Sequence, residues 1–216
     1  MNRKNTLTRL KAKEREHRQA LIIDAAREVF GQKTYDKTSM AEIAKTAGIA
    51  KSSIYTYFKS QEELYAKIAY MDSRVFLEDL EARIDQARKD PGSKECLNLC
   101  ITGFLSYYID HAAQWRMITH FALHGNKEMG AMGQLNEIGR RLMDLFESAL
   151  REQGCEMDTR ILAHTLFSSL SGILIAFRNY PGRTEAERIA HMKRIGTMVE
   201  AMVLAMVEQK EFPHGK

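Results

Sequence analysis

The sequence predicts an all-α protein, and two observations support this fold class. Only three of its 216 residues are proline, whereas the strong helix formers Ala, Leu, Met, Glu, Lys and Arg are abundant. Apolar residues also recur at intervals of three and four along most of the chain, which is the period of an α-helix. This length allows one large or two small domains, either of which can bury a sizeable core.

Positive charge is concentrated at the N-terminal end. Residues 1–60 carry a net charge of +7, and the remaining residues carry −3. We expect residues 1–19 to form a basic, mobile arm that is helical at most towards its end. Such an arm either follows DNA phosphates and enters the minor groove, or remains a solvated tail. Basic charge by itself is also compatible with an anionic membrane or RNA.

The next segment predicts a first helix from Ala20 to about Gly31, followed by two short helices joined by a turn. Ser39 and Glu42 have the spacing of a capping box, which satisfies the first free amides of a helix. Gly48 follows the apolar positions of that helix, where a left-handed residue can end it. The apolar positions expected to pack these two helices together are Met40, Ile43, Ala44, Ala47, Ile49, Ile54 and Phe58.

The second short helix has a polar, basic and aromatic face. Lysine and tyrosine side chains suit phosphate oxygens, and small serine and threonine side chains allow close approach to a DNA groove. Two helices joined by a glycine turn therefore predict a helix-turn-helix. The alternative is a helical hairpin inside a larger bundle, whose polar face is only solvated.

The segment Thr38–Leu64 resembles the N-terminal signature of the TetR family of transcriptional regulators. The shared positions are Thr38, Ile43, Ala44, Ala47, Gly48, Tyr55, Phe58 and Leu64. Three positions depart from the family pattern. Ala50 replaces a serine and cannot cap a helix with its side chain, Tyr57 replaces a histidine, and Gln61 replaces a lysine.

The resemblance implies two domains behind the basic arm at 1–19. A three-helix DNA-binding domain is expected at 20–66, with the helix-turn-helix at about 39–58, and a helical ligand-binding and dimerisation domain at 67–216. The DNA-binding residues that it implies are Thr38, Ser39, Lys51, Ser52, Ser53, Tyr55, Thr56, Tyr57 and Lys59.

Six further helices are expected after the helix-turn-helix. Their approximate ranges are Ser60 to just before Asp90, Cys96–Ala112, Trp115–His124, Gln134–Glu152, Thr159–Asn179 and a last helix capped by Thr184 and Glu187. The last two carry apolar stripes, which form either an internal core or a four-helix interface between two subunits. The resemblance favours a homodimer with interface residues Leu166, Leu170, Leu174, Phe177, Ile195, Met198, Met202 and Met206.

A small-molecule effector is expected to bind among aromatic side chains of the second domain. The candidate residues are Phe104, Tyr108, Trp115, Phe121, His124 and Phe146. The alternative is that these side chains are ordinary core. His120 and His124 are spaced to face one metal ion, but no third ligand is identifiable, and we expect no metal or other cofactor.

The sequence therefore predicts a cytoplasmic, homodimeric regulator of transcription and not an enzyme. We expect it to be a repressor that binds an inverted repeat in double-stranded DNA and is released by a small, largely apolar effector. We expect no signal peptide and no membrane span. The alternatives are a dimeric ligand sensor without sequence-specific DNA binding and, less favoured, an enzyme that uses His120 and His124 on a metal ion.

Overall fold

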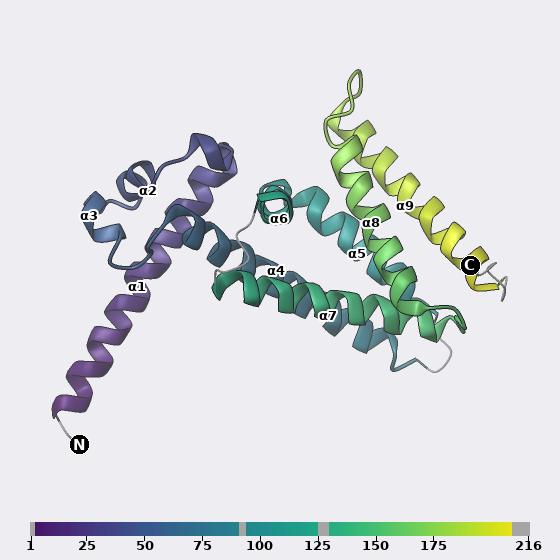
Figure 1. Ribbon diagram of the computed structural model, residues 1–216, viewed down its shortest axis with the longest axis horizontal. Coiled ribbons are helices and arrows are strands. Elements are labelled where there is room, and N and C mark those ends of the chain that lie inside the picture. Colours follow the sequence, from purple (N-terminus) through teal and green to yellow (C-terminus); the bar gives the residue numbers. More distant parts are fainter. Residues whose placement is uncertain (1–2, 91–93, 125–129, 209–216) are drawn as a thin grey trace. The chain divides into compact units, whose positions relative to one another are not determined.

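A computed structural model of the chain describes residues 3–90, 94–124 and 130–208 (Figure 1). The described residues form helices and contain no β-strand, which confirms the all-α prediction. A short 3₁₀ helix lies at Tyr35–Lys37. The α-helices are α1 Arg3–Gln32, α2 Met40–Thr46, α3 Lys51–Ile54, α4 Gln61–Ala87, α5 Cys96–Asp110, α6 Ala112–His124, α7 Gly130–Glu152, α8 Thr159–Phe177 and α9 Glu185–Glu208.

The chain divides into two compact units. The first comprises residues 1–71 and 116–133, and the second comprises 72–115 and 134–216. The division falls inside α4, between Met71 and Asp72. The predicted division at residue 66 lies in the same helix, and the inclusion of most of α6 in the first unit was not part of that prediction.

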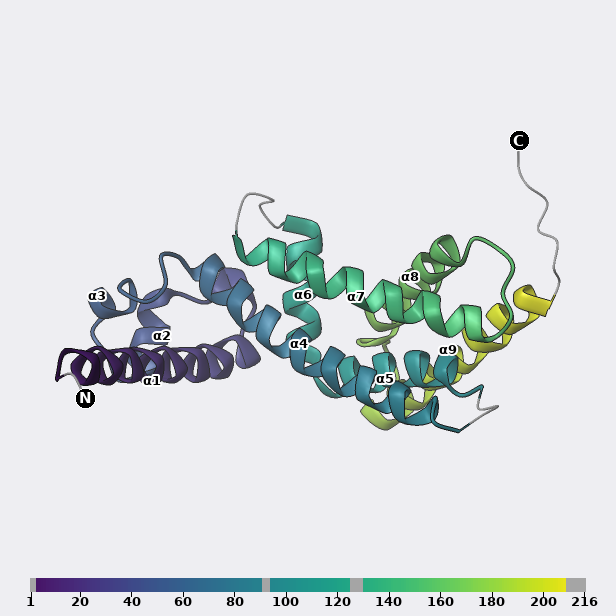
Figure 2. The same cartoon turned by 90° about the horizontal axis from the view of Figure 1, so that it is seen from below.

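In the first unit, α1 packs on α2, and α2 packs on α3 (Figure 2). The C-terminal half of α1 buries Ile22 and Ala26 completely, and α2 and α3 bury Ile43 and Ile54 completely. Their apolar spacing in the sequence matches this shared core.

Helix α1 begins at Arg3, so the prediction of a mobile arm at 1–19 is wrong for the described residues. No proline or glycine interrupts this segment, and its Lys, Arg, Glu, Ala and Leu residues favour a helix. Glu14 also forms an ion pair with Arg18 one turn later, with 3.0 Å between Glu14 Oε1 and Arg18 Nη2. The helix therefore continues outward from the half of α1 that packs in the core.

The predicted helix starts are confirmed by their caps. The Glu42 amide donates to Ser39 Oγ at 3.2 Å, and the Glu63 amide donates to Ser60 Oγ at 3.0 Å. At the start of α9, Thr184 and Glu187 bond reciprocally. Serine and threonine therefore satisfy amides that have no partner in the first turn of a helix.

In the second unit, α5, α8 and α9 pack together, and ion pairs join α7 to the second half of α4 and to Arg88, the residue after it. Arg141 pairs with Glu81 at 2.6 Å, and Arg88 Nε donates to Glu152 Oε1 at 2.8 Å. Gly196 lets α9 approach α5 closely, because a Cβ at this position would clash with Leu105.

Of the described helices, α8 alone is long and apolar enough by composition to cross a membrane, and 33% of its most apolar window is buried. Asp158 caps it by accepting from the amides of Arg160 and Ile161. One face of α8 contributes Leu162, Leu166, Leu170 and Leu174 to the core of the second unit. Its apolar composition is thus partly explained by packing inside the chain.

Candidate nucleic-acid interface

The turn between α2 and α3 orients the second helix. Gly48 adopts φ 68°, a left-handed conformation that costs glycine little, and the Ile49 amide donates to the Ala44 carbonyl at 3.0 Å. Helix α3 spans only Lys51–Ile54, and its N-cap residue Ala50 provides no side-chain cap, as the sequence indicates. Hydrogen-bonded turns continue the coil to Phe58, whose buried ring fixes this end of the segment.

A groove of about 380 Å³ brings the predicted DNA-binding side chains together. Lys51 and Lys59, from the two ends of the α3 segment, line it together with the hydroxyls of Ser39 and Tyr55. These four side chains are exposed to solvent. The groove also contains Met40, Ala41, Ser60 and Gln61. Two cations beside several hydroxyl groups form a surface that suits the phosphates of a nucleic acid.

The other predicted contacts differ in exposure. Ser52 and Thr56 are exposed, whereas Ser53 and Tyr57 are half-buried. Thr38 is buried, and its hydroxyl donates to the Thr34 carbonyl at 3.1 Å. This hydrogen bond gives Thr38 a structural role in the loop before α2.

Gln61, one of the departures from the TetR pattern, joins two parts of the first unit. Its side-chain amide donates to the Tyr35 carbonyl at 2.8 Å, which ties the start of α4 to the 3₁₀ helix. Lys33 forms an ion pair with Glu42 and joins the end of α1 to α2 in a similar way. These contacts hold the helix-turn-helix in place without the lysine that is common at this position.

Within the first unit, α6 packs against the other helices through an aromatic cluster that the sequence did not reveal. The ring of His120 lies 4.4 Å from that of Tyr35 and 5.4 Å from that of Tyr65, measured between centroids. Phe121 lies 5.5 Å from Tyr65. Burial raises the pKa of Tyr65 to about 12, so this phenol stays neutral. Arg116 donates to the carbonyls of Phe30 and Gly31 at 3.3 and 3.1 Å, where α1 is ending.

The predicted effector residues are divided between the two units. Phe104, Tyr108, Trp115 and Phe146 lie buried in the second unit, with the Phe104 ring within 4.9–6.2 Å of the other three. The remaining two, Phe121 and His124, belong to the first unit.

Two buried oxygen atoms lie next in sequence to this aromatic cluster. Gln114 precedes Trp115, and Ser171 lies one helical turn after Phe167, whose ring is 5.7 Å from that of Phe104. Among the described residues, Gln114 Oε1 and Ser171 Oγ have no hydrogen-bond partner within the protein. Such atoms are polar groups that a bound molecule can satisfy.

Two kinds of candidate chemical group, metal-binding clusters and the thiols of Cys96 and Cys100, can be assessed in the described part of the chain. No three His, Cys, Asp or Glu side chains of the described residues are grouped so as to hold a metal ion. Burial raises the pKa of the Cys96 thiol to about 11, and also raises that of Cys100, so both thiols stay protonated.

The predicted dimer residues are placed in two environments. Leu166, Leu170 and Leu174 are completely buried in the chain's own core, because they face the other helices of the second unit. Met198 and Met202 on α9 are 64% and 63% exposed, and Phe177, Ile195 and Met206 are half-buried. The sequence missed Ile161 and Ile175 on α8, which are equally exposed, because a helix with apolar residues on several sides does not reveal which side is buried.

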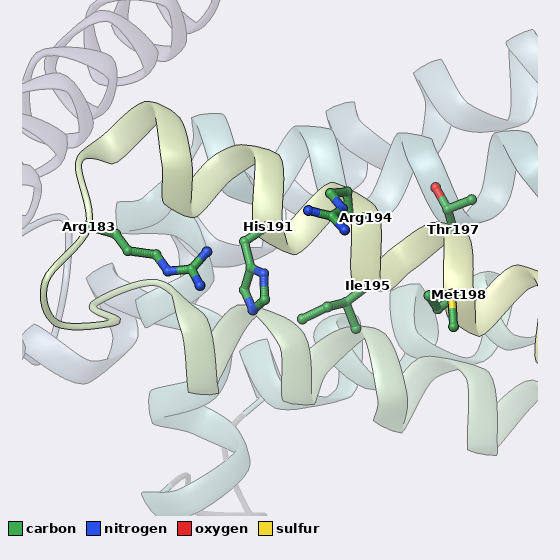
Figure 3. A pocket seen from close by; sticks show the side chains of 6 residues that line it. All are labelled: Arg183, His191, Arg194, Ile195, Thr197 and Met198. Carbon is green, nitrogen blue, oxygen red and sulfur yellow. The ribbon is translucent and has the colours of Figure 1, made fainter.

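A pocket of about 570 Å³ opens on this face of α9 (Figure 3). Figure 3 shows His191 and Ile195 pointing from α9 toward α8, with Arg183 extending toward His191 from the preceding loop. The pocket is completed by Arg194, Thr197 and Met198. Exposed apolar and basic side chains therefore lie side by side on the surface predicted to meet a second subunit.

Residues 22–68 match the family of bacterial regulatory proteins of the tetR type. The fatty acid metabolism regulator protein of Bacillus subtilis is 28% identical over 156 residues, which cover 69% of this chain and 77% of that protein. The chain belongs to the TetR family. It is a regulator of transcription, and its relatives are regulators and not enzymes, in agreement with the sequence prediction.

Two further comparisons extend the likeness of this TetR regulator. The transcriptional activator FasR of Mycolicibacterium smegmatis is 32% identical over 106 residues, which are 48% of this chain and 46% of that protein. The crystal structure of FadR from Bacillus subtilis in complex with stearoyl-CoA superposes with a TM-score of 0.64 at 22% identity, over 89% of this chain and 97% of that one. At this identity the superposition shows the shared fold.

Proposed function

We propose that this TetR regulator is a homodimeric repressor that binds an inverted-repeat operator and is released by a small, largely apolar effector. The single observation that carries the proposal is the groove in which Lys51, Lys59 and the hydroxyls of Ser39 and Tyr55 converge. The protein acts in the cytoplasm, where bacterial DNA is accessible to it.

The candidate DNA contacts divide into two groups by the part of the DNA that they suit. Lys59 and Tyr55 are suited to phosphate oxygens, which fix the position of the protein but carry no sequence information. Lys51, Ser52 and Ser53 belong to the first turn of α3 and are suited to base edges in the major groove. A base-contacting turn flanked by phosphate contacts is the arrangement that a helix-turn-helix needs.

The dimer is supported by the apolar face of α8 and α9. Ile161, Ile175, Met198 and Met202 are each more than 60% exposed, and each loses contact with water when a second copy covers the face. A two-fold dimer presents two copies of α3, so the half-sites should be inverted repeats about one DNA turn, roughly 34 Å, apart.

The effector is supported by the aromatic cluster of the second unit and by the ligand of a relative. The cluster around Phe104 supplies apolar surface, and Gln114 Oε1 and Ser171 Oγ supply oxygen atoms without partners inside the described part of the protein. The Bacillus FadR structure holds stearoyl-CoA, so long-chain acyl thioesters are the first compounds to test. An effector that releases DNA must bind the DNA-incompetent arrangement more tightly, and DNA must weaken effector binding by the same factor.

The first experiment selects duplexes from a random DNA pool with the purified protein at about 50 and 200 mM salt, since phosphate contacts make binding strongly salt-dependent. We expect an inverted repeat to be recovered. Recovery of nothing above background at the lower salt concentration would contradict the proposal and favour a ligand sensor without DNA recognition.

Variants then test the division between phosphate and base contacts. Lys59→Ala should weaken binding to all sequences and reduce the slope of log affinity against log salt by about 0.9 per lost phosphate contact. Changes of Lys51 or Ser52 should alter which sequence is selected. A salt slope for Lys59→Ala equal to that of the wild type would disprove its phosphate contact.

The direction of regulation is tested with the selected operator placed at a promoter upstream of a reporter gene. A repressor lowers reporter output, and addition of an acyl thioester restores it. FasR is an activator, so increased output in the presence of the protein is the specific result that would replace repression by activation.

A further inference from the structure

The N-terminal half of α1 is a helical, strongly basic extension of the first unit. From Thr8 to Arg18 every side chain is exposed, so no burial in the chain explains why this segment is present. Leu10 is the one large apolar side chain in this segment, and it is 57% exposed. At about 1.5 Å per residue these turns extend for roughly 15 Å, the length of four to five base pairs.

The positive charges of this extension lie on two faces of the helix. Lys11, Arg15 and Arg18 are spaced by four and three residues, so they form one stripe along α1. Arg9 and Lys13 are also four residues apart but lie on the opposite face, because two residues advance a helix by about 200°. We call the first set the inner stripe.

One contact shows which face of α1 is turned toward the DNA-binding helix. The guanidinium carbon of Arg15 lies 5.7 Å from the ring centroid of Tyr57. Tyr57 lies in the turn after α3, two residues after Tyr55 and two before Lys59, both of which line the groove. The inner stripe therefore lies on the side of α1 that carries the turn after α3, and the N-terminal turns of α1 continue past α2 and α3 (Figure 1).

We propose that Lys11, Arg15 and Arg18 form a second DNA-contacting surface, which binds phosphates of the duplex flanking the half-site that α3 reads. This inference rests on the proposed DNA binding and adds a longer footprint to it. A row of cations without an apolar face suits a phosphate backbone, whereas a membrane-surface helix needs a face of large apolar side chains. Glu14 borders the stripe and pairs with Arg18, so Lys11 and Arg15 are expected to contribute most.

A matched pair of double variants tests the surface. K11Q/R15Q removes one lysine and one arginine from the inner stripe, and R9Q/K13Q removes the same two residue types from the opposite face. The dissociation constant of each full-length protein for the selected operator is measured at several salt concentrations, with the helix content of both variants checked by circular dichroism.

We expect K11Q/R15Q to bind the operator about tenfold or more weakly near 100 mM salt. Two lost contacts in each subunit of a dimer should make its salt slope shallower by about 3.6. R9Q/K13Q should stay within about twofold of the wild type, because its side chains face away. The ratio of operator to non-operator affinity should be unchanged in both, since phosphate contacts carry no sequence information.

Equal losses in the two variants, or a wild-type salt slope in K11Q/R15Q, would overturn the second surface while leaving operator recognition by α3 intact. If the wild type selects no sequence from the random pool but K11Q/R15Q still weakens general DNA binding with the expected change of slope, the operator proposal fails and the second surface stands. If the wild type binds no DNA, both proposals fail.

Discussion

His120 is the residue whose environment in the first unit could be least expected from the sequence. Its ring packs against Tyr35 and Tyr65, which come from the 3₁₀ helix and from α4. Burial lowers the pKa of His120, and the neighbouring His124 lowers it further. The folded chain therefore favours the neutral form of His120, and the unfolded chain binds a proton at this imidazole more readily.

This lowered pKa predicts a pH dependence of stability. A basic group whose pKa is lower in the folded chain than in the unfolded chain stabilises the fold above its unfolded pKa, which is about 6.5 for histidine. This stabilisation is lost as the pH falls through the unfolded pKa. Between about pH 7.5 and 5.5 the wild type should lose more free energy of unfolding than His120→Phe, which keeps a ring but cannot titrate. Urea unfolding of both proteins at the two pH values measures the difference. An equal loss in the two proteins would show that His120 does not contribute.

Single residues of the helix-turn-helix were predictable where the signal was local. Ser39 and Gly48 act within three or four residues of their own position, and the structure confirms the serine cap and the left-handed glycine. The role of Thr38 was not predictable in the same way. A threonine at a family DNA-contact position gives no sign that its hydroxyl is bonded to the Thr34 carbonyl.

At the scale of helices, the contact of α9 with α5 depends on Gly196. A Cβ there would clash with Leu105 and lie 3.8 Å from Ile101, both on α5. Gly196→Ala should therefore lower the free energy of unfolding by about 1–3 kcal/mol, the usual cost of overpacking a core. Thermal or urea unfolding gives this value.

Gly139 in α7 is the matched control for Gly196, because a Cβ there meets nothing within 4 Å. Gly139→Ala should raise stability by about 0.5–1 kcal/mol, since alanine restricts the unfolded chain and favours a helix. Destabilisation of similar size in both variants would show that the close approach of α9 to α5 is not the cause.

Helix positions were predicted well, and helix partners were not. The ranges expected for α4, α5, α8 and α9 agree with the structure to within about three residues, because apolar periodicity and caps are encoded in each segment. The partners of a helix depend on contacts between distant residues. This explains why Leu166, Leu170 and Leu174 were assigned to a subunit interface although they fill the chain's own core.

At the scale of the whole molecule, the exposed face of α8 and α9 predicts the oligomeric state. Replacing Met198 and Met202 with glutamate places two carboxylates per subunit where the proposed interface is apolar, and burying an unpaired charge is costly. The double variant should raise the dimer dissociation constant by about a hundredfold or more. Sedimentation velocity measures this change, and operator affinity should fall with it because a monomer holds only one half-site.

Val75→Glu is the control for the charge itself. Val75 is 59% exposed on α4, outside the proposed interface, so this variant should remain a dimer with wild-type operator affinity. A monomeric wild type, or a double variant that dimerises as tightly as the wild type, would contradict the assignment of this face.

The first unit is assembled from two separate stretches of chain, residues 1–71 and 116–133. A fragment cut after Met71 keeps the helix-turn-helix but loses the rings of His120 and Phe121 and the bonds from Arg116. The side chains of Tyr35 and Tyr65 would then meet water where α6 had covered them. The DNA-binding unit of this regulator therefore cannot be transferred to a relative as one continuous segment. A hybrid protein has to exchange α6 together with the N-terminal helices.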